Sequence, residues 1–225
     1  MSQPFRLNKE GLINRNKKIS FTFNGKKLFG YEGDTIASAL IANGIHLVGR
    51  SFKYHRPRGF FGAGVEEPNA KLQVEFNGHS EPNVNATEME LVEGLSATSQ
   101  NCWPSVNFDI GAINNFLKMF FPAGFYYKTF MWPKSFWYKI YEPFIRKAAG
   151  LGVASIEKDK ERYEHKFEYC DLLVTGSGPS GLASAYAAAK NGAKVILAED
   201  KPRFGGTLLT DDVSIDNLSG KDWAE

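Results

Sequence analysis

The chain has 225 residues, of which 43% are hydrophobic and 23% are charged, and its formal net charge is +2. This composition is typical of a globular protein of one or two domains and excludes a disordered chain. The near-neutral charge does not indicate a nucleic-acid partner. The first 20 residues lack the apolar core of a secretory signal, and no apolar run reaches the ~18 residues of a membrane-spanning helix, so we expect a cytoplasmic protein without a membrane anchor.

The first predicted elements are a β-hairpin and a helix. Residues 19–31 alternate apolar and polar side chains around Asn24-Gly25, a pair that favours a tight turn between two strands. Asp34 is the expected N-cap of a helix over residues 35–42, which Asn43-Gly44 would end.

Two further strands are predicted at residues 71–76 and 84–92, separated by Asn77-Gly78 and Pro82. Hairpin, helix and then more strands is the order of a ubiquitin-like (β-grasp) sheet, which plant-type ferredoxins share. We therefore predict a ferredoxin-like β-grasp domain over residues 1–107.

The loop that carries the cluster cysteines in ferredoxins corresponds here to residues 49–64, which contain no cysteine. Cys102 and Cys170 are the two cysteines of the chain and lie far apart in sequence. So few cysteines fit a reducing compartment, and they are too few to bind a four-cysteine iron–sulfur or zinc centre within this chain. Since the histidines show no ligand spacing either, we expect no iron–sulfur cluster and no metal site.

Basic and aromatic side chains alternate in the same loop. The basic ones are Arg50, Lys53, His55, Arg56 and Arg58, and the aromatic ones are Phe52, Tyr54, Phe60 and Phe61. Such a loop can stack on a base or clamp a phosphate. Alternatively, it is an exposed basic loop whose aromatic side chains pack on the sheet.

Residues 108–168 form an aromatic-rich connecting segment and linker. Between Phe116 and Phe144, 13 of 29 residues are aromatic, and three prolines interrupt the segment. It could mark a membrane interface or a contact with another subunit, but we expect it to wrap irregularly over neighbouring domains. Residues 154–166 are charged and predict a solvated linker.

The segment from Cys170 to Asp200 has the pattern of a dinucleotide-binding unit. An apolar strand is predicted at residues 171–175, an alanine-rich helix from about residue 180 to 190, and a second strand at 194–198. Between the first strand and the helix, the glycines have G-x-G-x-x-G spacing. The first glycine permits a tight turn, the second lets a pyrophosphate approach, and the third lets the helix pack on the strand.

The helix would direct unpaired N–H groups at the phosphates, and Glu199 would accept bonds from ribose hydroxyls. An acidic residue at this position favours an unphosphorylated ribose, as in NAD or FAD. The nearby basic residues Lys201 and Arg203 could instead bind the 2′-phosphate of NADP, so NADP is not excluded. Residues 205–207 form either a second approach to the nucleotide or a plain loop. The candidate cofactor-binding residues are Gly176, Gly178, Pro179, Ser180, Gly181, Glu199, Asp200, Lys201, Arg203, Gly205, Gly206 and Thr207. No catalytic constellation stands out.

We expect residues 169–225 to be the incomplete start of a Rossmann-type domain, so that the chain combines α+β and α/β parts. A mononucleotide-binding half needs three strands, and two are predicted before Glu225. Either a partner completes the domain or the sequence is a piece of a longer polypeptide, and we favour the second.

Several long strings resemble the amino-terminal part of the α subunits of heterotetrameric sarcosine oxidases. They are GDTIASALIANGIHLVGRSFKYHRPRG, EEPNA, NCWPSVNFDIGAIN, PAGFYYKTFMWP and the glycine motif. The resemblance covers essentially the whole chain. It is more specific than the glycine spacing, and the cysteine-free loop favours sarcosine oxidase over relatives that keep cluster cysteines.

The resemblance implies NAD in this subunit, and FAD and FMN on or with a partner β subunit, with γ and δ subunits completing the complex. Sarcosine would be oxidatively demethylated to glycine with formation of H2O2, and the one-carbon unit would pass to tetrahydrofolate. The alternatives are a subunit of a flavin-linked amine, opine or proline dehydrogenase, and a non-catalytic dinucleotide-binding scaffold.

Overall fold

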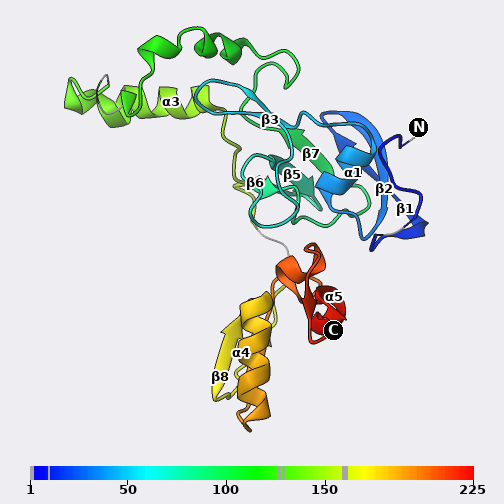
Figure 1. The fold of residues 1–225 in the computed structure, drawn as a ribbon. Coiled ribbons are helices and arrows are strands. Elements are labelled where there is room, and N and C mark those ends of the chain that lie inside the picture. Colours follow the sequence, from blue (N-terminus) through cyan, green and yellow to red (C-terminus); the bar gives the residue numbers. More distant parts are fainter. Residues whose placement is uncertain (1–2, 10, 126–127, 129, 159–161) are drawn as a thin grey trace. The chain divides into compact units, whose positions relative to one another are not determined.

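The structure is a computed structural model that describes the chain except residues 1–2, 10, 126–127, 129 and 159–161 (Figure 1). Tyr126 and Tyr127 of the aromatic segment therefore lie outside the described residues. The chain divides into two compact units, Met1–Asp159 and Lys160–Glu225. Among the described residues, no helix has the length and apolar character needed to cross a membrane.

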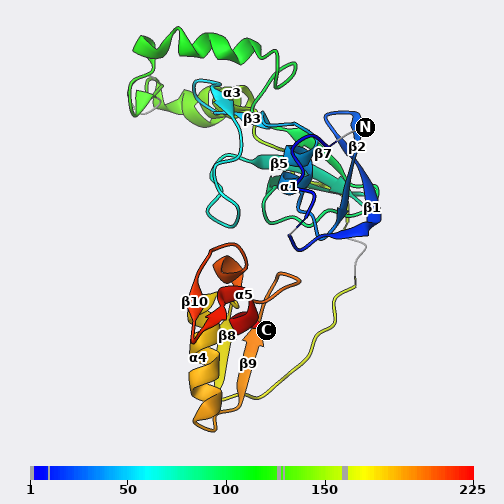
Figure 2. The ribbon, with the colours of Figure 1, turned by 45° about the vertical axis from the view of Figure 1, so that its right-hand side comes forward.

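A five-stranded sheet with one helix forms the centre of the first unit (Figures 1 and 2). Its neighbours are antiparallel except for one parallel pair, β1 with β7, and the order is β2-β1-β7-β5-β6. The elements are β1 (Asn14–Phe23), β2 (Lys26–Glu32), α1 (Ile36–Ala42), β5 (Lys71–Phe76), β6 (His79–Asn85) and β7 (Ser96–Ser99). This is the β-grasp arrangement predicted from the sequence.

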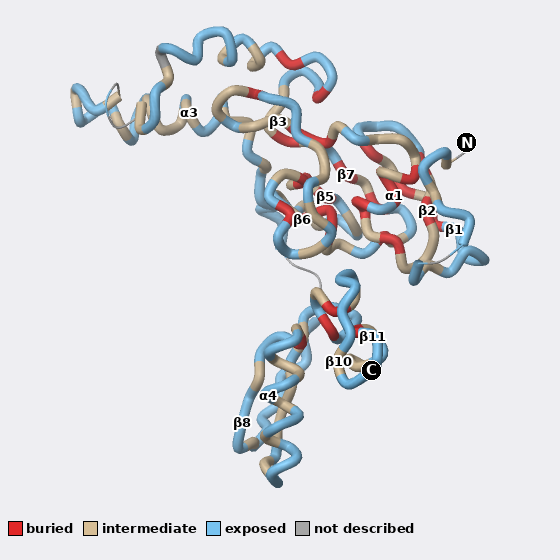
Figure 3. Tube along the Cα trace, in the orientation of Figure 1, coloured by how far each residue is buried: buried red, intermediate tan, exposed pale blue. Residues whose placement is uncertain are grey.

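The hydrophobic core lies between α1 and the sheet, and Figure 3 shows the buried residues gathered there. Phe21 of β1, Leu72 of β5 and Leu40 of α1 are all at most 2% exposed. Burying one such side chain contributes about 1.5–3 kcal/mol. The helix and the three central strands are therefore held together mainly by apolar contacts.

The predicted hairpin is confirmed, with Asn24 and Gly25 both at positive φ in its turn. The predicted helix is also confirmed, but the predicted N-cap is wrong. Thr35 caps α1 by accepting from the Ser38 backbone N–H, and the Ser38 hydroxyl oxygen accepts from Thr35 N.

Asp34 has a different function in the fold. It is 1% exposed and forms a two-fold hydrogen-bonded ion pair with Arg6, with N–O distances of 3.0 and 2.7 Å. Its carboxylate also accepts from Tyr31 N and from the Ser38 hydroxyl. Asp34 thus joins the amino-terminal segment, the end of β2 and the first turn of α1.

The predicted strand at residues 84–92 is wrong. β6 starts at His79 and ends at Asn85, and it pairs with β5 across the Asn77-Gly78 turn. Pro82 does not end β6, because it lies in an irregularity of the β5–β6 register, between the pairs Val74–Glu81 and Leu72–Val84. The four-residue strand β7, which contains two serines and a threonine, was not predicted.

The basic and aromatic loop is bound to the chain itself. Its first part forms a small hairpin, in which the short strands β3 (Gly49–Arg50) and β4 (Pro57–Arg58) pair. Arg50 Nε donates to Val106 O and the Tyr54 hydroxyl to Phe121 O, both at 2.8 Å. His55 and Asp109 form a buried pair with an N–O distance of 2.6 Å. These contacts attach the loop to residues 106–122. Phe60 packs against the core as the structural alternative predicts, but Phe52 and Phe61 are exposed and His55 is buried, so that alternative holds only in part.

Glu67, in the string EEPNA, organises the end of this loop. It is 1% exposed and accepts hydrogen bonds from the backbone N–H groups of Phe61, Gly62, Asn69 and Ala70. Burial alone would raise the pKa of Glu67, but the four backbone donors together lower it below its ordinary value. The carboxylate therefore stays ionised at neutral pH.

Residues 110–149 form an arm, which both ribbon views show extending from the sheet (Figures 1 and 2). Its regular elements are η1 (Ile110–Asn115), η2 (Lys118–Phe120), η3 (Lys134–Phe136), η4 (Trp137–Tyr141) and α3 (Glu142–Ala149). Where the structure describes burial in the arm, no side chain is buried. α3 was not predicted, because Pro143 suggested a break, whereas a proline is tolerated in the first helical turn.

The second unit begins with a strand–helix–strand arrangement. β8 (Leu172–Thr175) and β9 (Val195–Ala198) are parallel, and α4 (Pro179–Lys190) connects them. These three elements confirm the predicted ones. The elements that follow were not predicted: η5 (Gly206–Leu209), β10 (Ser214–Ile215), β11 (Leu218–Ser219) and α5 (Gly220–Ala224).

Candidate dinucleotide-binding site

The glycine turn joins β8 to α4, and its three glycines differ in their surroundings. Gly176 has φ +91°, a conformation that L side chains rarely adopt. A Cβ on Gly181 would lie 2.0 Å from Gly176 O, so only glycine allows this close packing. A Cβ on Gly178 would meet no heavy atom within 4 Å. The structure therefore leaves open space at the second glycine, where the sequence predicts the pyrophosphate.

The amino end of α4 adjoins this open space. Gly178 is the N-cap of the helix, Pro179 lies in its first turn, and Pro179 and Ser180 are exposed. No side chain caps the helix. Its first N–H groups and the positive end of the helix dipole are thus available to an anion.

Glu199 follows β9 and is held by four donors. Its Oε2 accepts from the backbone N–H of Ser177, at 2.6 Å, and from the Ser177 hydroxyl. Its Oε1 accepts from the backbone N–H groups of Asp200 and Lys201, both at 3.0 Å. The carboxylate therefore connects the end of β9 to the glycine turn.

These bonds keep Glu199 ionised. The Ser177 hydroxyl, then the Ser177 and Lys201 N–H groups, lower the pKa of Glu199 from its ordinary 4.5 to about 2, against a smaller opposing effect of burial. Because the pKa is lower in the folded state, the ionised carboxylate stabilises the turn above about pH 4.5. This stabilisation is lost as the pH falls toward 2.

The structure also brings residues 205–207 to the glycine turn. Gly205 N donates to Ser177 O at 3.0 Å. A Cβ on Gly206 would lie 3.0 Å from the Gly178 Cα, and Gly206 has φ +54°. This second glycine segment therefore packs directly against the first.

The remaining predicted residues lie on the loop between these two segments. Asp200, Lys201 and Arg203 are all exposed, and the Asp200 and Lys201 side chains form an ion pair of 3.4 Å. Sequence reasoning missed Ser177, which is fully buried and contacts both flanking segments. The glycine motif places no requirement on the residue between its first two glycines, so Ser177 was not considered. Its hydroxyl group was the one feature of the sequence that could have indicated a role.

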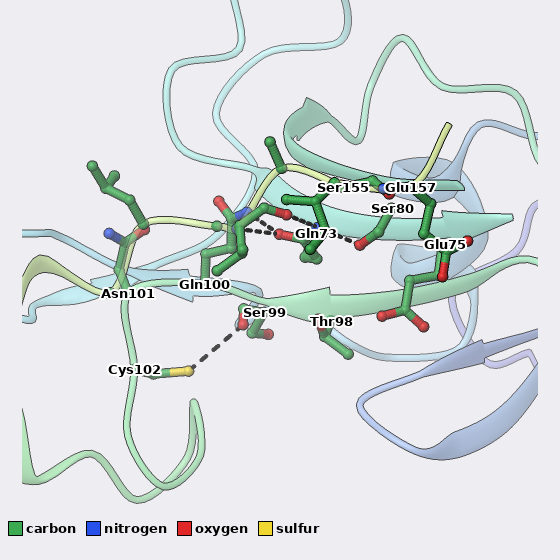
Figure 4. A pocket seen from close by; sticks show the side chains of 16 residues that line it. Gln73, Glu75, Ser80, Thr98, Ser99, Gln100, Asn101, Cys102, Ser155 and Glu157 are labelled. Atoms are coloured by element: carbon green, nitrogen blue, oxygen red, sulfur yellow. Dashed lines mark hydrogen bonds between the residues drawn. The ribbon is translucent and has the colours of Figure 1, made fainter. Parts of the chain in front are cut away.

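The first unit contains an open depression of about 500 Å³, shown in Figure 4. Several of its polar groups bind the chain's own backbone, whereas the buried Gln100 Oε1 has no hydrogen-bond partner among the described residues. The Gln73 side chain donates to Val153 O and accepts from Val153 N, both at 2.9 Å, and Ser155 N donates to Ser80 O. The predicted solvated linker is therefore attached to the first unit at its start, and the depression is where residues 150–155 are fixed.

Two family models match the chain. Residues 16–102 match a 2Fe-2S iron-sulfur cluster binding domain, and residues 171–217 match an FAD dependent oxidoreductase. The first match lies within the unit Met1–Asp159 and the second within the unit Lys160–Glu225.

Two curated relatives align with essentially the whole length of this chain. It is 57% identical over 220 residues to sarcosine oxidase subunit alpha of Rhizobium meliloti (strain 1021), covering 98% of this chain and 22% of that one. It is 31% identical to sarcosine oxidase subunit alpha of Corynebacterium sp. (strain U-96), covering 100% and 19%. The chain therefore spans about a fifth of the length of these relatives.

A solved structure has a similar fold. L-proline dehydrogenase from P. horikoshii matches with a TM-score of 0.52 and 19% identity, over 99% of this chain and 32% of that one. At this identity the likeness concerns the fold alone.

The first family match corrects our expectation that the chain has no iron–sulfur cluster, because the matched domain is one that binds such a cluster. That expectation relied on the cysteine-free loop, on the wide separation of Cys102 and Cys170, and on the lack of ligand spacing among the histidines. A [2Fe–2S] cluster usually has four thiolate ligands, whereas residues 16–102 contain one cysteine, Cys102. The described residues also contain no group of three His, Cys, Asp or Glu side chains suited to a metal. The described residues therefore do not supply a complete ligand set for a [2Fe–2S] cluster.

Proposed function

Since this chain is homologous to the α subunit of sarcosine oxidase over 98% of its length, we propose that it is the dinucleotide-binding part of such a subunit. It then belongs to a flavin-dependent complex that oxidises sarcosine to glycine. Oxygen is reduced to H2O2, and the one-carbon unit passes to tetrahydrofolate. The observation that carries the proposal is the 57% identity with the R. meliloti subunit.

The proposed site takes the ADP half of a dinucleotide, the part that NAD and FAD share. Three features support it: the open space at Gly178, the uncapped start of α4 and the ionised Glu199. The pyrophosphate would lie over the first two, and the adenosine ribose beside Glu199. We assign NAD to this subunit, and FAD and FMN to the partner β subunit, where substrate oxidation takes place.

Residues 1–107 and 169–225 are proposed as the ferredoxin-like domain and the start of a Rossmann-type domain, connected by residues 108–168. We assign no catalytic residue to the chain, so residues 1–225 alone would be inactive. The two free cysteines, Cys102 and Cys170, support a reducing compartment such as the cytoplasm.

The complete subunit, produced with its partner subunits, should consume oxygen and release H2O2 when sarcosine is added. Denaturation should release one NAD per α subunit, identified by mass spectrometry. FAD released from the α subunit in place of NAD would reassign the cofactor at the glycine turn. Turnover of opines or proline without peroxide would favour the alternative of a flavin-linked dehydrogenase, and dinucleotide release without turnover of any amine would favour a non-catalytic scaffold.

The arm is the proposed contact with another subunit. Phe116, Trp132 and Tyr138 are each more than 80% exposed, and isolated proteins rarely expose so many large apolar side chains together. Six cationic side chains accompany them (Lys118, Lys128, Lys134, Lys139, Arg146 and Lys147), against one acid in the arm, Glu142. The expected partner surface is therefore apolar with acidic groups around it.

Replacing Trp132 by alanine is expected to weaken subunit association at least about tenfold, because large aromatic side chains often dominate the energy of an interface. Size-exclusion chromatography of the diluted complex measures this as earlier dissociation. Phe167→Ala is the control, since Phe167 is at least as exposed as Trp132 but lies outside the arm. Equal stability of the two variant complexes would contradict the proposed contact.

A further inference from the structure

Ser177 is a single buried residue that contacts every segment of the candidate site. It lies between the first two glycines and is 0% exposed. Its N–H and its hydroxyl both donate to Glu199 Oε2, and its carbonyl oxygen accepts from Gly205 N. The end of β9 and the second glycine segment are therefore attached to the glycine turn through this residue.

The hydroxyl differs from the two backbone groups of Ser177. Any residue at this position offers an N–H and a carbonyl group, but only a small hydroxyl side chain adds a second donor to Glu199 Oε2 in a space this enclosed. A charge-assisted bond of this kind is stronger than one between neutral groups and fixes the direction of the carboxylate. In an alanine variant, Glu199 would keep three backbone donors, one on Oε2 and two on Oε1, and lose the second bond that holds Oε2.

We propose that Ser177 is a positioning residue that sets the orientation of Glu199 and thereby the preference of the site for an unphosphorylated ribose. This inference rests on the proposed function of the site as a dinucleotide-binding site. When Oε2 is held by both Ser177 donors, the Glu199 carboxylate keeps one direction, in which it can accept from ribose hydroxyls and repel a 2′-phosphate. A carboxylate that is held less firmly binds the hydroxyls more weakly and repels the phosphate less. The Ser177 hydroxyl thus acts on the ligand through Glu199 and not by direct contact.

The test compares Ser177→Ala with Ser184→Ala in the complete subunit freed of bound nucleotide. Ser184 undergoes the same chemical change on the exposed face of α4. Titration calorimetry with NAD and with NADP gives two dissociation constants for each protein. In Ser177→Ala, NAD binding should weaken about tenfold, and the preference for NAD over NADP should fall by a similar factor. Ser184→Ala should change neither.

The ratio of the two dissociation constants separates positioning from a loss of structure. If Ser177 only stabilised the fold, both ligands would weaken together, the ratio would stay constant, and the inference would be wrong. Unchanged NAD affinity in Ser177→Ala would also overturn it. If the unmodified subunit bound neither NAD nor NADP, the assignment of NAD in the proposed function would fail first, and this inference with it.

Discussion

Gly178→Val should abolish dinucleotide binding to the complete subunit while leaving its thermal unfolding temperature nearly unchanged. Gly178 has φ −64° and ψ 178°, which valine adopts readily, and an added Cβ meets no heavy atom within 4 Å. The protein therefore accommodates the side chain, which then occupies the space proposed for the pyrophosphate. We expect affinity to fall at least about 100-fold, measured by calorimetry and by the dinucleotide content of the purified protein.

Two further variants show whether this loss is specific. In Gly181→Ala, the new Cβ would collide with Gly176 O, so both binding and unfolding temperature should fall. Ala187→Val lies on the exposed side of α4, and it should change neither by much. Stoichiometric dinucleotide in Gly178→Val would show that the pyrophosphate does not lie at this turn.

Asp34→Ala should lower the free energy of unfolding of the first unit by about 3 kcal/mol or more. Removing Asp34 leaves the Arg6 guanidinium, which is 14% exposed, without its ion-pair partner. Breaking a buried ion pair from one side is among the most destabilising single changes. It also removes acceptors for Tyr31 N and the Ser38 hydroxyl. Chemical denaturation monitored by circular dichroism measures the change.

Glu32→Ala is the matched control for this prediction. Glu32 forms an ion pair with Lys17 in the same unit, but both side chains are well exposed. Because water can replace an exposed ion pair, its loss changes the free energy of unfolding little. The variant should therefore unfold at nearly the same denaturant concentration as the unmodified protein. If the free energy of unfolding fell by similar amounts in the two variants, the Arg6–Asp34 pair would stabilise the fold no more than an exposed ion pair does.

Local patterns were sufficient to predict the hairpin and the strand–helix–strand unit. Asn24-Gly25 defines a turn by itself, and the glycine spacing with an alanine-rich helix defines the second unit within about 30 residues. The part of the candidate site that was predicted is the part that follows from this glycine spacing, namely the turn, the start of the helix and the acid after the second strand. The structure adds that residues 205–207 reach the glycine turn.

The errors arose where the deciding partner is distant in sequence. Asp34 was assigned to a helix cap because its ion-pair partner, Arg6, lies 28 residues away. β6 was misplaced because the bulge that accommodates Pro82 becomes visible only once β6 is paired with β5. Ser177 was overlooked because its role requires Glu199, 22 residues further along, to lie beside it. Sequence periodicity contains none of these relations.

The absence of buried side chains in the described part of the arm has a consequence for how the protein is made. A segment without a core of its own draws its order from whatever covers it, and until then its aromatic side chains adhere to one another. If another subunit covers the arm, as proposed above, then copies of this chain made without that subunit should aggregate through the arm. Expression of the chain alone should therefore give inclusion bodies, and co-expression with the partner should reduce them.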